Sequence, residues 1–161
     1  MRARSGDIFL FPALDPGPEI SAAVFLMKPR SRGRVRLTSR DPEAPLAIEH
    51  GFLADPGDGE ALAEGVEMLR RIAGEEPIAA YAARESRPGP EVDAATHVRE
   101  AARGFFHPTG TCAIGRVVDA SGRVLGYEGL AVADASTMPT IPRSNTHLST
   151  LAIAERIAEL L

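Results

Sequence analysis

Apolar positions along the chain change their spacing, from short runs in the first third to a helical period after it. Residues 8–11 and 22–27 are short apolar runs separated by Asp-Pro-Gly-Pro, which is typical of a turn between strands. Residues 34–37 alternate polar and apolar side chains, as a half-buried strand does, and residues 46–49 form a further strand candidate. The first third of the chain is therefore predicted to be rich in β-structure.

Two helices are predicted in the middle of the chain. The apolar period of residues 62–73 predicts a helix that begins after Pro56 and ends at Gly74. Asp93 is a suitable N-cap for a second helix over residues 94–103.

The last third combines loops with one closing helix. Residues 117–125 are predicted to form a hairpin and residues 130–133 a strand, followed by a turn-rich loop over residues 134–145. Residues 146–161 are predicted to close the fold as an amphipathic helix. Its buried face is expected to contain Leu148, Leu151, Ala152, Ile157 and Leu160.

Length and charge exclude some classes of protein. A chain of 161 residues suits one domain. The net charge is −4 and the only basic cluster is residues 28–36, so a nucleic-acid partner is not expected. No stretch approaches the length of a membrane span, so no membrane partner is expected. Cys112 is the single cysteine, which fits a reducing compartment, and we expect a cytoplasmic protein.

Four histidines are the candidates for proton transfer near neutral pH. His107 and His147 border irregular segments rich in Gly, Pro, Ser and Thr, where catalytic groups concentrate. His50 and His97 are expected to be structural or exposed. Spacing alone leaves open whether His107 and His147 are paired or unrelated. Cys112 and His107 do not have the spacing of a zinc site, and no metal is expected.

Residues 107–115 (HPTGTCAIG) are similar to the His-x-x-Gly-Thr-Cys-x-Met-Gly segment of the glucose–methanol–choline (GMC) oxidoreductase family, with Ile114 in the place of Met. The resemblance extends over about residues 20–161. Its order continues through Val117-Val-Asp, Arg123-Val-Leu-Gly-Tyr-Glu-Gly-Leu, Asp134-Ala-Ser, Met138-Pro, Asn145-Thr and Ala154-Glu.

The resemblance implies an α+β fold, with a mostly antiparallel sheet covered by helices on one face. A C-terminal strand–loop–helix would follow, which in the family packs onto an FAD-binding domain. We expect a single domain over residues 1–161, with the substrate-domain sheet and helices in 1–106 and a catalytic, flavin-facing segment in 107–161. The chain contains no Gly-x-Gly-x-x-Gly turn for the FAD pyrophosphate. A partner chain or a missing N-terminal half is therefore expected to bind most of the FAD.

The resemblance also implies a reaction, the FAD-dependent oxidation of a small-molecule alcohol, a CH–OH donor. His107 matches the family's catalytic histidine, which takes the hydroxyl proton while hydride leaves for the flavin. His147 matches the second group that hydrogen-bonds the same oxygen. The residues expected to face the cofactor are Asp134, Ala135, Asn145, Leu148 and Ser149.

Purely structural roles are the alternatives to these expectations. Asp134 could cap a turn and Asn145 could cap the final helix. Cys112 is expected to be a packed residue rather than a nucleophile, because the sequence places no evident base beside it. The chain as a whole could be an inactive truncated remnant, or a repurposed binding module without redox activity.

Overall fold

The computed structural model describes residues 7–14, 19–82 and 84–161, which fall into two compact units. The first unit comprises Met1–Arg32 and Gly51–Arg103, and the second comprises Gly33–His50 and Gly104–Leu161. Both are α+β, with small antiparallel sheets and helices, which confirms the predicted class. The functional division between residues 106 and 107 stays a prediction.

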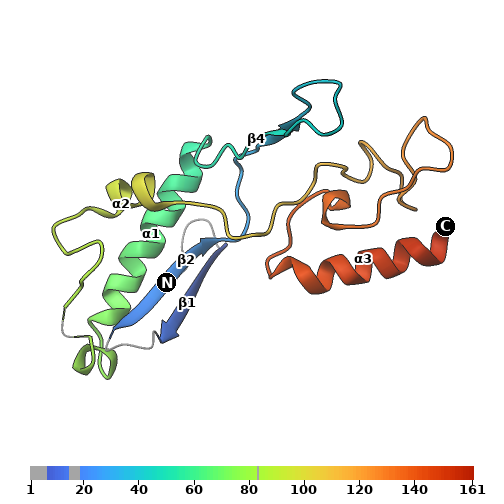
Figure 1. Cartoon of the computed structure of the whole chain (residues 1–161). Helices are drawn as coiled ribbons and strands as arrows, with labels where there is room; N and C mark the ends of the chain where they lie inside the picture. The colour runs from blue at the N-terminus through green and yellow to red at the C-terminus, as the bar shows by residue number, and fades with distance from the viewer. Residues whose placement is uncertain (1–6, 15–18, 83) are drawn as a thin grey trace. The chain divides into compact units, whose positions relative to one another are not determined.

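A hairpin and a long helix form the first unit (Figure 1). Strands β1 (Ile8–Leu14) and β2 (Ile20–Leu26) pair antiparallel, with Leu10 opposite Val24. Helix α1 (Pro56–Ala73) packs on this hairpin, and its bounds confirm the helix predicted from the sequence. The contact is close at Gly65, where a Cβ atom would collide with Val24 and lie 3.2 Å from the Cγ2 atom of Ile8.

The buried face of α1 differs from a row of large apolar side chains. Its buried residues are Asp58, Ala61 and Gly65, and at Gly65 the hairpin leaves no space for a side chain. Asp58 is 4% exposed and accepts backbone N–H bonds from Arg30 at 2.9 Å and from Ser31 at 2.8 Å. Desolvation would raise the pKa of Asp58, but these hydrogen bonds and the Arg30 charge together lower it below the usual range. The carboxylate therefore ties the segment after β2 to the start of α1.

Shorter elements complete the first unit, namely η1 (Ile78–Ala80) and helix α2 (Ala94–Ala101). Asp93 caps α2 by accepting the N–H bond of Thr96 at 2.9 Å, so the predicted cap is confirmed. Arg70 of α1 holds the loop before α2 through the Glu85 carboxylate and the carbonyl groups of Gly89 and Val92.

The second unit contains one short hairpin, β3 (Arg34–Arg36) and β4 (Ala47–Glu49). Glu49 accepts from both Arg36 and Arg34, and these two bonds lower the pKa of its carboxyl group. The pairing of β3 with β4 confirms both predicted strands. The predicted sheet consists of two separate pairs of strands.

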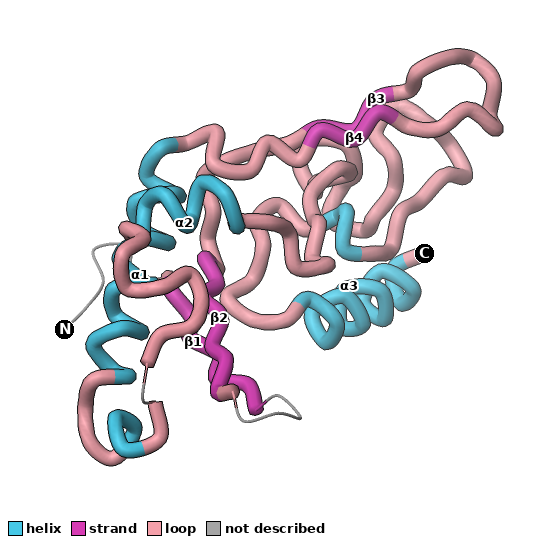
Figure 2. Tube along the Cα trace, turned by 60° about the vertical axis from the view of Figure 1, so that its left-hand side comes forward, coloured by secondary structure: helices cyan, strands magenta, loops and turns pink. Residues whose placement is uncertain are grey.

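Loops make up most of the rest of the second unit, with η2 (Ala135–Thr137) and helix α3 (Thr146–Leu160) between them (Figure 2). The predicted hairpin over 117–125 forms through a single bridge between Val118 and Val124. The predicted strand over 130–133 is wrong, because only Ala131 forms a bridge there. Val118, Thr137 and Ile157 are the largest fully buried side chains.

Helix α3 confirms the predicted element but not its predicted apolar face. Of the five residues expected on that face, only Ile157 is buried, whereas Leu148 is 76% and Leu151 49% exposed. The second unit therefore buries only the face of α3 that contains Thr146 and Ile157. Within the described part of the chain, no helix has the length and apolar character needed to cross a membrane.

Candidate functional site

The loop that carries His107 is bonded to the segment that contains η2. The backbone N–H of Cys112 donates to the carbonyl of Ser136 at 2.9 Å, and that of Ile114 donates to the carbonyl of Thr137 at 2.9 Å. The N–H of Gly110 reaches the carbonyl of Ala135 at 3.3 Å. Two sequence segments predicted to carry site residues, 107–115 and 134–138, therefore lie side by side.

His107 is held at one ring nitrogen and unpaired at the other. Its Nδ1 atom lies 2.8 Å from the Oγ1 atom of Thr146, the first residue of α3. Its Nε2 atom is buried and has no hydrogen-bond partner among the residues that the structure describes. Buried polar atoms are almost always paired in proteins, so an unpaired one indicates a missing partner or a chemical role.

Two phenylalanines precede His107 and shape its surroundings. The ring of Phe105 meets the imidazole edge to face, with centroids 5.9 Å apart and an interplanar angle of 76°. Phe106 has a φ angle of 55°, in the left-handed region that bulky residues rarely adopt. Backbone strain of this kind clusters at functional sites. Strain and an unpaired nitrogen thus occur at neighbouring residues.

His147 follows Thr146 but differs from it in burial. Its side chain is exposed, whereas Thr146 is only 7% exposed. Within the described ranges, no hydrogen bond joins His147 to His107. The structure thus brings His107 to the start of α3, and the direct partner there is Thr146. The role predicted for His147 stays a prediction.

Asp134 and Asn145 have different outcomes as helix caps. The Asp134 side chain accepts the N–H bond of Ser136 at 2.7 Å and caps η2, as the structural alternative predicted. Asn145 stands at the N-cap of α3, but its side chain makes no capping hydrogen bond. The capping role suggested for the Asn145 side chain is therefore wrong, and its amide group is left for other contacts.

The first turn of α3 carries the remaining predicted residues. Leu148 is exposed and Ser149 is half-buried. The first N–H groups of a helix have no partner within the helix, and the dipole there is positive. This turn can therefore donate to an electron-rich ring edge.

Thr146 is the site residue that the sequence did not identify. Its hydroxyl contacts an imidazole 39 positions away, which no local spacing rule indicates. The sequence signal was limited to a Thr beside a candidate His at a predicted helix start.

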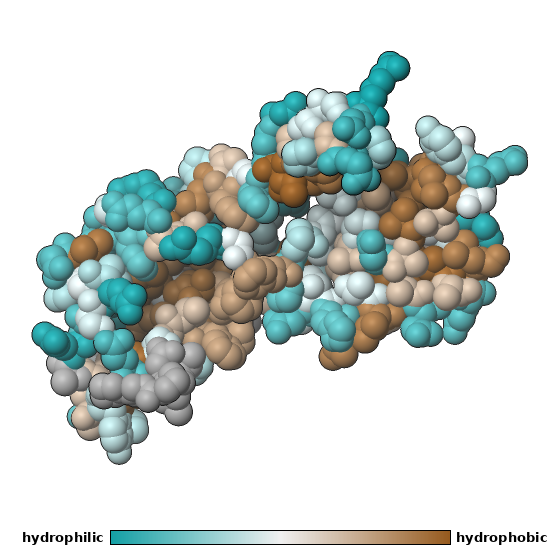
Figure 3. Space-filling model, in the orientation of Figure 1, coloured by the Kyte–Doolittle hydropathy of each residue, from teal (hydrophilic) through white to brown (hydrophobic). Residues whose placement is uncertain are grey.

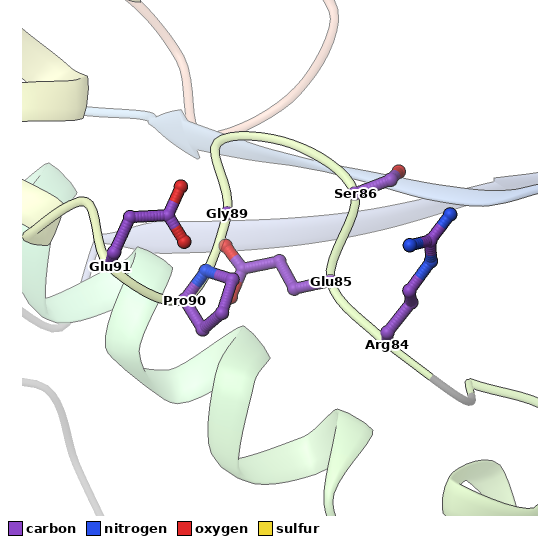
Figure 4. Close-up of a pocket in the computed structure, with 6 residues that line it drawn as sticks. All are labelled: Arg84, Glu85, Ser86, Gly89, Pro90 and Glu91. Atoms are coloured by element: carbon purple, nitrogen blue, oxygen red, sulfur yellow. The ribbon is translucent and has the colours of Figure 1, made fainter.

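The first unit contains an open hollow of about 390 Å³ beside the loop before α2 (Figure 4). It is lined by Arg84, Glu85, Ser86, Gly89, Pro90 and Glu91. Glu85 is already bound by Arg70, and no predicted site residue lines the hollow. Glu85 therefore belongs to the loop's own attachment. Among the described residues, no group of three or more His, Cys, Asp or Glu side chains is placed to hold a metal ion.

Comparison with known proteins identifies the family. The model of the GMC oxidoreductases matches residues 29–154, which is most of the chain and includes His107, Asp134 and Thr146. The chain belongs to the GMC oxidoreductase family. The match is to the C-terminal part of these oxidoreductases.

Individual members agree with this assignment. The GMC chain is 39% identical over 146 residues to an oxygen-dependent choline dehydrogenase of Chromohalobacter salexigens, covering 86% of this chain and 26% of that protein. A pyridoxine 4-oxidase from Mesorbium loti superposes with a TM-score of 0.78 at 31% identity, over 88% of this chain and 29% of that one. An FAD-dependent oxidoreductase from Chaetomium thermophilum gives a TM-score of 0.78 at 26% identity, over 86% and 26%. The GMC chain spans about a quarter of the length of the curated relatives it matches.

The residues present fit one side of an FAD group. The unpaired Nε2 atom of His107 suits a reactant placed against the ring system, and the first turn of α3 offers backbone donors. The pyrophosphate has no corresponding Gly-x-Gly-x-x-Gly turn in the sequence. The GMC chain can therefore contribute to the flavin-ring side of a site.

Proposed function

We propose that this GMC chain is the substrate-side part of an FAD-dependent oxidoreductase that converts a small-molecule alcohol to a carbonyl compound. The observation that supports this most strongly is the buried, unpaired Nε2 atom of His107, in a loop bonded to the 134–138 segment. A nitrogen in this state can accept the hydroxyl proton of an alcohol.

His107 is proposed as the base. The alcohol O–H bond breaks and its proton moves to Nε2, while the C–O bond becomes a carbonyl. Bound FAD would supply the acceptor for the hydride that leaves the alcohol carbon. In the structure Nε2 is closed off from solvent, so the groups over it must move before an alcohol oxygen can approach.

His147 and the first turn of α3 are proposed to act on the substrate oxygen and on the cofactor. A donor directed at the oxygen stabilises the charge that develops as the proton leaves. His147 is exposed and can take this role. The backbone N–H groups of Leu148 and Ser149 are proposed to face the flavin ring. Asp134, Ala135 and the Asn145 side chain, which does not cap α3, are proposed to face it as well.

A flavin-binding half is proposed to cover the outer side of α3, whether it is on a partner chain or in the same polypeptide. The exposed leucines on that side are Leu148 and Leu151. Apolar atoms are visible at the surface along this helix (Figure 3). Large apolar side chains exposed together on one helix face are typical of a surface that packs against another protein part.

Turnover of the flavin-loaded protein tests the proposal. His107→Ala should lower turnover of alcohol by roughly 10²–10⁴-fold, the usual contribution of a general base. The FAD content should stay the same, because His107 is not proposed to hold the cofactor. His97→Ala is the matched control, because His97 lies on α2 in the other unit. It should leave turnover nearly unchanged, because no role in the reaction is proposed for His97.

Two outcomes would contradict the proposal. Equal turnover of the His107→Ala variant and the unsubstituted protein would remove His107 as the base. Absence of alcohol-dependent turnover even with bound FAD would favour the inactive remnant or a binding module without redox activity.

A further inference from the structure

The hydrogen bond between His107 and Thr146 defines the state of the imidazole. The Oγ1–Nδ1 distance is 2.8 Å, and Thr146 is only 7% exposed, so this bond is partly shielded from water. The Thr146 carbonyl accepts from the Oγ1 atom of Thr150 at 2.8 Å, within the first turns of α3. The Thr146 side chain is thus directed at the ring while its backbone is part of the helix.

A neutral imidazole has one N–H group and one bare nitrogen, and the bond at one nitrogen decides the state of the other. A threonine hydroxyl can either donate or accept. If it donated to Nδ1, the proton of His107 would lie on Nε2, which is a buried atom without a partner. Buried backbone N–H groups without an acceptor are rarer in proteins than buried carbonyl groups without a donor, and an imidazole N–H group buried without an acceptor carries the same kind of desolvation cost. The arrangement therefore favours an N–H group at Nδ1 and a bare Nε2.

We propose that Thr146 is a positioning residue, which accepts a hydrogen bond from Nδ1–H of His107 and so keeps Nε2 free of a proton. The catalytic meaning of this inference rests on the proposed function, because a bare Nε2 is what a base requires. The same bond fixes the orientation of the ring at Nδ1.

A purely structural role for the hydroxyl would predict a different pattern. Thr and Asn near the start of a helix usually stabilise it by accepting its free N–H bonds. At α3 the Asn145 side chain makes no such bond, and the Thr146 hydroxyl contacts the imidazole. The start of α3 thus has no side-chain cap from Asn145, and the Thr146 hydroxyl instead determines the tautomer of His107.

The tautomer can be read directly by nitrogen NMR of protein labelled with ¹⁵N-histidine. The spectrum is recorded at about pH 9, above the range in which imidazoles ordinarily titrate. A His107→Gln sample assigns the signals of His107. In the unsubstituted protein, Nδ1 of His107 is expected to carry the proton and Nε2 to be bare. A proton found on Nε2 would overturn the proposal without any substitution at Thr146.

Variants then test the role of the hydroxyl. Thr146→Val keeps the shape and removes the acceptor, so His107 should show a mixture of tautomers or a shift to the Nε2–H form. Thr146→Ser should keep the Nδ1–H form. Thr150→Val, one turn further along α3, removes the same type of hydroxyl and should leave the His107 signals unchanged. An unchanged tautomer in Thr146→Val would also overturn the proposal.

Kinetics of the flavin-loaded protein separate this inference from the proposed function. Thr146→Val should lower kcat/KM for the alcohol by roughly 10–100-fold, which is typical when a group that orients a reactive residue is lost. Thr146→Ser should stay within a few-fold of the unsubstituted protein. If His107→Ala leaves turnover unchanged, the proposed function fails while the NMR result stands. If only Thr146→Val has no effect on tautomer and rate, the role of Thr146 fails by itself.

Discussion

Two glycines of α1 differ in their surroundings, so alanine substitutions at these positions should change the stability of the protein in opposite directions. Gly65 faces the hairpin, and an added Cβ atom would collide with Val24 and lie 3.2 Å from Ile8. Gly59 lies six positions earlier in the same helix, and an added Cβ there meets nothing within 4 Å. Alanine at either position gains helix propensity, about 0.5–1 kcal/mol.

At Gly59 this gain should appear in full, so Gly59→Ala should raise the free energy of unfolding by about 0.5–1 kcal/mol. At Gly65 the extra methyl group overfills a packed contact, which costs about 1–3 kcal/mol. Val24 is β-branched and has few alternative rotamers, so it cannot easily turn aside. Gly65→Ala should therefore be destabilising by up to about 2 kcal/mol after the propensity gain.

Urea unfolding of the protein measures both values on the same scale. A double substitution adds an internal check, because Val24→Ala opens the space that the new methyl group needs. Gly65→Ala should then cost less, or become stabilising, in the Val24→Ala background, with a coupling of about 1 kcal/mol or more. Equal stabilisation by Gly59→Ala and Gly65→Ala would refute the close packing of α1 on β2.

Three further predictions concern the rest of the chain. The pKa of Asp58 is lowered in the folded state, so its stabilising contribution is present above about pH 4 and is lost as the pH falls through the folded-state pKa. The unfolding free energies measured at pH 7 and pH 3 should therefore differ less in Asp58→Asn than in the unsubstituted protein. An equal acid sensitivity of the two proteins would contradict this. Arg70→Met should lower the unfolding free energy by about 2 kcal/mol and speed proteolysis of the loop before α2. Arg71→Met, at the exposed neighbouring position, should change the unfolding free energy by less than about 0.5 kcal/mol. Gly122→Ala should destabilise the second unit by about 1–3 kcal/mol more than Gly126→Ala. Both glycines have positive φ, but only at Gly122 would an added Cβ atom lie 2.7 Å from Ile157 and 2.7 Å from the Val132 carbonyl oxygen. Thermal unfolding of both variants tests this, and equal losses of stability would contradict that contact.

Local signals were sufficient for the elements that local rules determine. Asp93 and the apolar period after Pro56 indicated two helices, and both formed, because capping and amphipathic spacing act within a few residues. The strand expected over residues 130–133 did not form beyond one bridge, because a strand needs a partner that its own sequence does not specify.

The site divides in the same way. His107 was predicted from its loop and from the resemblance, but its partner Thr146 was not, because the bond joins residues far apart in the chain. The exposure of Leu148 was also missed, since an amphipathic pattern identifies an apolar face and not the surface that will cover it. The unused side chain of Asn145 could not be predicted either, because Asn at a helix start ordinarily caps.

The most direct test of the central claim is anaerobic mixing of the flavin-loaded protein with an alcohol substrate, followed by the loss of visible flavin absorbance in a single turnover. This measurement isolates the oxidation of the alcohol from any later transfer of electrons. His107→Ala should slow the loss of absorbance by roughly 10²–10⁴-fold with the same FAD content. An equal rate in the His107→Ala variant would contradict the claim that this chain supplies the base for alcohol oxidation.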